Sequence, residues 1–271
     1  MTTYLAEKEI HVAGLQRTGQ HAIIIWIAGH FNKVCFKNGM SPAGDRASRG
    51  FSPPWMYLDI GKKGFDIEFN KDKLVRKNQD VFILGTEYQQ YGCALNPSID
   101  SETSKMARDI GFDEFSRDSK NVLVIRSPWN QLASILSWKK KWYMKRKDRF
   151  IRGWKNSARE ALGVTNNFPE PKIIVKYDDW FVNKKYRRSI SKQLGIPFSD
   201  KGLNIVMPIG WGTKGSSFDR MEYKKNAQKM AVNDRWKKYK DNHVEFLDVL
   251  RMDSELMDMS RQLFGEFPFE L

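Results

Sequence analysis

The chain has 271 residues, and its 41% hydrophobic and 13% aromatic content is enough for a real core and argues against global disorder. The length predicts a single domain over residues 1–271. The formal net charge of +14 predicts attraction to anions such as nucleotides, nucleic acids, acidic sugars or membrane surfaces, without choosing among them.

Cysteine use and the apolar runs bear on the cellular compartment. Cys35 and Cys93 are too few for a disulfide framework, so we expect two reduced thiols. Residues 1–9 are mixed and polar, unlike a signal peptide, and the apolar run 22–28 is too short to cross a bilayer. We therefore expect a soluble, cytoplasmic protein that does not bind membranes.

Short apolar strands alternate with helices along the chain. In order, the sequence predicts strand 9–14, helix 18–31, loop 39–54, strand 80–84, strand 121–125, helix 127–138, helix 146–162, strand 172–176, helix 183–194, glycine-rich loop 208–217, a long polar helix 220–240 and two shorter helices. Continuous apolar strands between helices favour a parallel sheet buried on both faces. The predicted fold class is therefore α/β, with three α/β/α layers around a central parallel sheet.

A glycine-containing turn joins the first strand to the first helix, with the sequence Gly14-Leu15-Gln16-Arg17-Thr18-Gly19-Gln20-His21. The Gly-x-x-x-x-Gly spacing is that of a Walker A loop, whose backbone wraps a phosphate at a helix N-terminus. A Walker A loop continues with Lys and then a Ser or Thr that binds Mg²⁺, but here these positions are Gln20 and His21. The loop instead contains the cation Arg17. The alternative is a plain strand–turn–helix junction with an exposed arginine.

A second candidate phosphate motif follows the strand 121–125. Arg126 ends this strand, and Ser134 lies eight residues later, in the second turn of the next helix. Ligands of parallel sheets bind at the carboxyl ends of the strands. Arg126 and Ser134 are therefore placed to grip one phosphate, through a guanidinium fork and a hydroxyl. The alternative is a surface arginine and a buried helical serine.

Together these motifs resemble the sulfotransferases that use PAPS (3′-phosphoadenosine 5′-phosphosulfate). The segment 14–21 resembles their 5′-phosphosulfate loop, particularly the Gly-x-Gln-Lys-Thr-Gly form of the heparan N-sulfotransferase type, and Arg126 with Ser134 resembles their 3′-phosphate signature. The segment 175–179 resembles a strand ending in Tyr-Glu-Asp, and 212–215 resembles the late basic glycine loop over the 3′-phosphate. The resemblance covers roughly residues 9–240 and implies a P-loop-NTPase-like sulfotransferase fold.

The resemblance also implies a donor, PAPS, a product, PAP (the desulfated nucleotide), and a reaction that needs no metal. The family usually has Lys at Arg17 and Thr-Thr at Gln20 and His21. Arginine can still bind the oxygen that bridges the sulfur and the 5′-phosphate of PAPS. It is a poorer proton donor than lysine because it is always charged. The residues implied to bind the donor are Gly14, Gln16, Arg17, Thr18, Gly19, Gln20, His21, Arg126, Ser134, Tyr177, Lys214 and Gly215.

Sulfuryl transfer to a hydroxyl needs a general base. The stretch Leu84-Gly85-Thr86-Glu87 follows the strand 80–84 and resembles the Lys-Thr-His stretch of cytosolic members, with Glu in the His position. Glu87 is therefore the predicted base and Arg17 the second catalytic residue, with His21 as the next candidate for the base. The alternative is a solvated or ion-paired glutamate. We expect His11 and His30 to be structural.

A cluster of lysines and arginines between residues 139 and 152 bears on the nature of the acceptor. If the cluster is a binding surface for the acceptor, it favours an anionic acceptor such as an acidic saccharide. The alternative is a solvated helix face without a binding role. Its members are Lys139, Lys140, Lys141, Lys145, Arg146, Lys147, Arg149 and Arg152.

The sequence thus predicts a sulfotransferase that moves a sulfuryl group from PAPS to a hydroxyl or amine of a saccharide or small molecule. Two other functions stay open. The net charge suits a non-enzymatic nucleic-acid-binding protein, although the chain has no helix-turn-helix, zinc or RNA-binding signature. The loop suits a nucleotide-dependent kinase, although it lacks the Lys-Ser/Thr pair.

Overall fold

The computed structural model describes residues 6–38, 55–61, 64–68, 79–88, 113, 116–144, 147–205, 227–239 and 244–268. The described strands form a seven-stranded sheet in the order β4-β3-β2-β5-β1-β6-β7. They are β1 (Ala6–Leu15), β2 (Val34–Asn38), β3 (Trp55–Gly61), β4 (Gly64–Glu68), β5 (Gln79–Tyr88), β6 (Asp118–Ile125) and β7 (Lys172–Lys176).

Five of the described strands run parallel at the centre of the sheet. β2 pairs with β5, β5 with β1, β1 with β6, and β6 with β7, all in one direction. The predicted central parallel sheet is confirmed. β3 and β4 extend the β2 edge as an antiparallel hairpin, which the sequence did not indicate.

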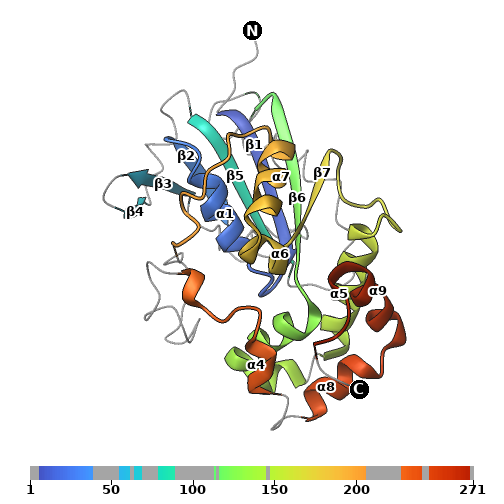
Figure 1. Ribbon diagram of the computed structural model, residues 1–271. Helices are drawn as coiled ribbons and strands as arrows, with labels where there is room; N and C mark the ends of the chain where they lie inside the picture. The colour runs from blue at the N-terminus through green and yellow to red at the C-terminus, as the bar shows by residue number, and fades with distance from the viewer. Residues whose placement is uncertain are drawn as a thin grey trace.

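Helices cover both faces of the sheet (Figure 1). On one face lie α1 (Gln20–Ala28), α6 (Tyr177–Val182) and α7 (Lys184–Leu194). On the other lie α4 (Pro128–Met144), α5 (Lys147–Ala161), α8 (Val244–Arg251) and α9 (Ser254–Phe264). Alternate residues of β6 supply the two cores, with Val122 and Val124 facing α1 and Leu123 and Ile125 facing α4 and α5. The predicted three layers are confirmed.

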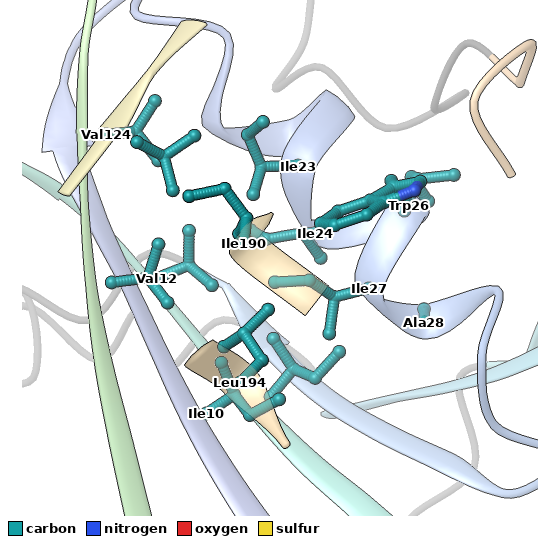
Figure 2. Packing of buried hydrophobic residues seen from close by; sticks show 14 of the residues in the cluster. Ile10, Val12, Ile23, Ile24, Trp26, Ile27, Ala28, Val124, Ile190 and Leu194 are labelled. Carbon is teal, nitrogen blue, oxygen red and sulfur yellow. The ribbon is translucent and has the colours of Figure 1, made fainter. Parts of the chain in front are cut away.

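From residue 23 to residue 28 the helix α1 is apolar on all sides, and this segment is completely buried. Figure 2 shows this segment against Val12 and Val124 of the sheet, with Ile190 and Leu194 of α7 packed beside it. Burying one such side chain stabilises the fold by about 1.5–3 kcal/mol relative to leaving it exposed. The N-terminus of α1 is therefore held in a fixed place at the end of β1.

One predicted helix differs from the structure in kind, and several predicted elements differ in length. Over 227–239 the predicted polar helix is wrong, because this stretch forms two short 3₁₀ helices, η2 (Ala227–Lys229) and η3 (Arg235–Lys238). Between them, Val232 and Asn233 bond to distant parts of the chain rather than along a helix. The strand predicted to end at residue 84 runs on to Tyr88, because β5 keeps pairing with β1 up to Leu15.

Some predictions concern residues outside the described part of the chain. These are the loops 39–54 and 208–217, which include Lys214 and Gly215, and also Cys93. Cys35 is buried in β2. None of the helices that the structure describes is long and apolar enough to cross a bilayer.

Candidate functional site

The two predicted phosphate motifs meet at the carboxyl ends of β1 and β6, which are neighbours in the sheet. The chain leaves β1 for α1 on one face and leaves β6 for α4 on the other. Ligands of open α/β sheets bind at such a switch point between adjacent strands. The site is therefore where the topology alone would place it.

The loop after β1 is a tight, strained turn. Arg17 has a φ of +70°, although it is not glycine, and Gly19 has a φ of +93°. Thr18 holds the turn by donating twice to the Leu15 carbonyl, from its backbone N (3.2 Å) and from its Oγ1 (2.9 Å). A non-glycine residue in this region costs about 1–2 kcal/mol, and such strain is typical of ligand-binding sites.

Both glycines of the loop are needed for close packing. A Cβ on Gly14 would lie 2.6 Å from Oγ1 of Thr18 and 3.0 Å from the carbonyl oxygen of Val124 in β6. A Cβ on Gly19 would lie 2.3 Å from the Tyr177 ring. The loop thus rests against β6 on one side and Tyr177 on the other.

Gln20 begins α1 at the position where a Walker A loop has lysine. Its side chain is 2% exposed, and neither its Nε2 nor its Oε1 has a hydrogen-bond partner among the described residues. A buried unpaired polar group costs about 1–3 kcal/mol, so such groups usually have a ligand or water. An amide N–H at a helix N-terminus suits an anionic oxygen.

Arg126 is almost completely buried, at 3% exposed. Its Nη1 donates to the Arg17 carbonyl (3.2 Å), its Nη2 donates to the Val232 carbonyl, and its Nε has no partner in the described part of the chain. Its guanidinium carbon lies 5.0 Å from the centre of the Tyr177 ring. Burial lowers the pKa of Arg126 to about 10, against the influence of Asp178, so the group stays charged at neutral pH.

Ser134 connects the loop to the far end of the chain. Its Oγ accepts one hydrogen bond from Nε of Arg17 and another from Nη1 of Arg235, each 3.0 Å long. Burial raises the pKa of Tyr177, while Arg126, Arg235 and Arg17 each act to lower it. Arg17 and Arg235 therefore meet at Ser134, and Arg126 lies against the ring of Tyr177.

Asp178 is the carboxylate at this site, and it holds the turn after β6. It accepts from the backbone N and the Oγ of Ser127, both at 2.8 Å, and from Nδ2 of Asn130 at 3.2 Å. Its backbone carbonyl accepts from Nδ2 of Asn233 at 3.2 Å. Among the described side chains, Asp178 faces Arg17, Arg126 and Arg235, a set that suits an anionic ligand. No described group of three or more His, Cys, Asp or Glu side chains is arranged for a metal ion.

The structure brings most of the predicted donor-binding residues together. The carbonyl of Gln16 accepts from Nε2 of Gln131 at 2.7 Å, and His21 lies in the first turn of α1. In the register of β1 and β5, Glu87 lies beside Gly14, so its backbone is at the edge of the site. Lys214 and Gly215 lie outside the described residues. The roles of all these residues stay predictions.

Sequence reasoning missed Arg235 and Asn233. Both lie in the segment that the sequence predicted to be a polar helix, where they looked like solvated residues. Their contacts span 101 residues to Ser134 and 55 residues to Asp178, and no local pattern marks such pairs. The sequence signal nearest to this segment was the resemblance of 212–215 to the late basic glycine loop over the 3′-phosphate.

Two histidines have the structural contacts expected of them. Nε2 of His11 lies 2.6 Å from Oε1 of Glu9, and both side chains are buried. Nδ1 of His30 lies 2.8 Å from the Trp26 carbonyl, at the end of α1.

The fold is similar to that of solved sulfotransferase domains. The sulfotransferase domain from the Synechococcus PCC 7002 olefin synthase is 14% identical, with 98% of this chain and 97% of that chain covered and a TM-score of 0.50. The sulfotransferase domain from the curacin biosynthetic pathway is also 14% identical, with 98% and 100% covered and a TM-score of 0.54. No family model and no curated protein matches the chain. The predicted sulfotransferase fold is confirmed.

Proposed function

We propose that the protein transfers a sulfuryl group from PAPS to a hydroxyl or amine of its acceptor and releases PAP. The observation that carries the proposal is the meeting of Arg17, Arg126 and Arg235 at the switch point of a sulfotransferase fold. PAPS has anionic groups at its 5′ and 3′ ends. A site with several cations on different elements suits such a ligand.

The loop favours PAPS over a magnesium nucleotide. Gln20 stands where a Walker A loop has its phosphate lysine, and His21 stands where it has the hydroxyl that binds Mg²⁺. The amide of Gln20, at the N-terminus of α1, has no partner in the described part of the chain and can donate to an oxygen of the 5′-phosphosulfate. The close packing of Gly14 and Gly19 shapes the backbone around that group.

Each catalytic role in the proposal belongs to a residue of this chain. PAPS supplies an electrophilic sulfur bonded to a phosphate leaving group. Glu87 accepts the proton of the acceptor while the acceptor oxygen or nitrogen bonds to sulfur. Arg17 and the N–H groups at the start of α1 stabilise the bridging oxygen, which keeps the electron pair of the broken sulfur–oxygen bond. Arg126 and Ser134 hold the 3′-phosphate.

We further propose an anionic acceptor, such as an acidic saccharide or small molecule. The support is the net charge of +14 and the basic cluster between residues 139 and 152, of which Arg152 is exposed on α5. Anionic substrates are steered toward such surfaces.

A transfer assay with PAPS labelled in its sulfuryl group tests the proposal. We expect label to pass from PAPS to one of a panel of acidic saccharides, phenols and amines, and we expect added PAP to inhibit. If no acceptor takes label and PAP does not bind, the protein is not a PAPS-dependent enzyme.

A further inference from the structure

The helix α7 exposes a row of cations on the side that faces away from the sheet. Its apolar residues Ile190 and Leu194 are buried in the core. The exposed side has four cations and no acidic residue, and the cations are Lys184, Lys185, Arg188 and Lys192. At 3.6 residues per turn these four side chains start within an arc of about 100°, and the row is about 12 Å long.

Other contacts hold α7 firmly in place. The side chain of Asn183 caps its N-terminus by accepting from the backbone N of Tyr186 at 3.1 Å. The hydroxyl of Tyr186 accepts from the backbone N of Lys176 in β7 at 3.0 Å. A fifth cation of the helix, Arg187, is buried and donates from Nε to Oδ1 of Asp200 at 2.8 Å. Arg187 is therefore structural, and the four exposed cations stand on a rigid support.

The placement of the exposed cations works against the stability of the helix. Lys184 and Lys185 occupy the first turn, where the helix dipole disfavours cations and no acidic residue offsets them. Arg188 and Lys192 follow Lys184 at intervals of four residues, a spacing at which like charges repel. None of the four has an ion-pair partner in the part of the chain that the structure describes, whereas Lys176 in β7 pairs with a carboxylate. Local rules of this kind are broken mainly where function requires it.

The exposed side of α7 suits an anionic chain better than a lipid surface. Nζ of Lys184 lies 5.9 Å from the ring centre of Phe198, and the guanidinium carbon of Arg188 lies 5.0 Å from it. Such contacts hold a cation near an aromatic face while leaving it accessible to an anion. A helix that binds at a lipid interface needs an apolar face toward the lipid. The apolar face of α7 is instead buried against the sheet.

The row of cations begins near the candidate site and runs away from it. The helix α6 directly precedes α7, and its first residue, Tyr177, packs against Gly19 of the loop after β1. At the other end of α7, a Cβ on Gly195 would lie 3.6 Å from Nζ of Lys8, near the start of β1. The row therefore starts near the carboxyl edge of the sheet and follows its outer layer toward the amino edge (Figure 1).

We infer that the exposed side of α7 binds an anionic chain and that this chain is the acceptor, an acidic saccharide of several sugars rather than a small molecule. This inference rests on the proposed function. When one group of the chain reacts at the carboxyl edge, its next acidic groups can pair with Lys184, Arg188 and Lys192. These cations follow one another at about 6 Å along the helix, which suits repeated charges on an extended chain. The basic cluster of residues 139–152 belongs mostly to α4 and α5, on the other face, and is a separate surface.

The binding test uses oligouronates of two and of twelve sugars, with one carboxylate on each sugar, in the absence of PAPS. Calorimetry gives the Kd of each for wild type and for the triple variant Lys184→Gln/Arg188→Gln/Lys192→Gln. A second variant, Lys185→Gln/Lys192→Gln, leaves both contacts with Phe198 intact and so tests the charges alone.

A matched control separates the row on α7 from the net charge of the protein. The variant Lys33→Gln/Lys237→Gln/Arg261→Gln also removes three charges, all at exposed positions on other elements. A neutral glucan of twelve sugars and an oligothymidylate of twelve nucleotides are measured beside the oligouronates. The glucan tests whether binding needs charge, and the oligothymidylate tests whether α7 prefers a nucleic acid.

We expect wild type to bind the long oligouronate at least tenfold more tightly than the short one and not to bind the glucan. The triple variant should lose at least fivefold in affinity for the long chain, the second variant at least threefold, and the control less than twofold. Unchanged affinity in the triple variant overturns the inference. An equal loss in the control overturns it as well, because binding then reflects net charge. Tighter binding of oligothymidylate than of oligouronate overturns it in favour of a nucleic acid.

Transfer from labelled PAPS distinguishes failure of this inference from failure of the proposed function. With an acidic saccharide that takes label, the triple variant should raise the acceptor KM at least fivefold and leave kcat and the KM for PAPS unchanged. If label passes equally well to single sugars or phenols and the variants have no effect, the inference fails and the proposed function stands. Binding along α7 without transfer to any acceptor and without PAP binding overturns the proposed function and, with it, the role of the chain as acceptor.

Discussion

Nε of Arg17 donates a 3.0 Å hydrogen bond to Oγ of Ser134, across 117 residues of sequence. This bond joins the loop after β1 to the second turn of α4 and so links the two motifs that resemble the 5′ and 3′ signatures of sulfotransferases. Each motif alone has an ordinary structural explanation. Their meeting at the switch point of the sheet makes them one site.

The first prediction concerns Arg126. Arg126→Ala removes the charge and also leaves the carbonyls of Arg17 and Val232 without this donor. We expect PAP binding to weaken at least tenfold, which is about 1.4 kcal/mol, as measured by calorimetry. We also expect a lower Tm, because buried carbonyls lose their partner. Wild-type affinity for PAP in the folded variant would remove Arg126 from the donor site.

The second prediction concerns metal ions. With Gln20 and His21 in place of the Lys-Ser/Thr pair, the loop has no hydroxyl that matches the Mg²⁺ ligand of a Walker A loop. We expect sulfuryl transfer to continue at the same rate in excess EDTA. Loss of turnover on chelation, with recovery on adding Mg²⁺, would favour the kinase alternative.

The third prediction concerns the base. Glu87 lies beside Gly14 at the carboxyl end of the sheet, and Glu87→Gln keeps its shape while removing the proton acceptor. A positioned base contributes about 10²- to 10⁴-fold in rate. We expect kcat to fall by about 10² or more, with the Kd for PAP changing less than about threefold, because a residue that serves as the base should contact the acceptor and not the donor.

Two results would reassign Glu87. Near-normal kcat in Glu87→Gln would mean that another group is the base, and His21 is the next to test. A collapse of PAP binding in a folded variant would mean that Glu87 organises the donor site.

The fourth prediction concerns stability. Glu160 is buried in α5 and accepts from Nζ of Lys172 (2.7 Å), Oγ1 of Thr165 (2.7 Å) and the backbone N of Asn167 (2.9 Å). We expect Glu160→Gln to lower the free energy of unfolding by about 2 kcal/mol, measured in urea. Glu170→Gln is the control, because Glu170 is exposed and lies 3.5 Å from the same lysine.

The effect of Glu160 should depend on pH. Burial raises its pKa, but the hydrogen bond from Lys172 and those from Asn167, Thr165 and Phe168 outweigh burial and hold the pKa below its ordinary value of 4.5. A carboxylate with a lowered pKa stabilises the fold above its unfolded pKa, and this stabilisation is lost as the pH falls through the folded value. The gap between wild type and Glu160→Gln should therefore be constant near pH 7 and shrink below about pH 4.5. A constant gap down to pH 3 would contradict the role of its charge.

Most of the parallel strands and the helices beside them could be predicted because they contain continuous apolar runs or clear helical spacing. The strand predicted over 172–176 matches β7, and the helix predicted over 183–194 begins one residue later, capped by the side chain of Asn183 and ended at Gly195. The strands β2, β3 and β4 and the six-residue α6 were missed, because polar or charged residues interrupt their apolar runs.

The site could be predicted only where local motifs mark it. The turn with Arg17 and the Arg126–Ser134 spacing are visible in the sequence, since each motif follows a strand. The sequence does not indicate that Arg126 uses two of its nitrogens on backbone carbonyls. Nor does it indicate that Arg235 contacts Ser134, because that contact depends on the tertiary fold.

Calorimetric titration of the wild-type protein with PAP, beside Mg²⁺-ATP under the same conditions, tests the central claim most directly. A site with Arg17, Arg126 and Arg235 around Ser134 should bind PAP with a Kd below about 100 μM, a binding free energy of about −5.5 kcal/mol or better. It should bind Mg²⁺-ATP at least tenfold more weakly. Absence of PAP binding, or tighter binding of Mg²⁺-ATP than of PAP, would contradict the assignment of this site to a PAPS-type donor.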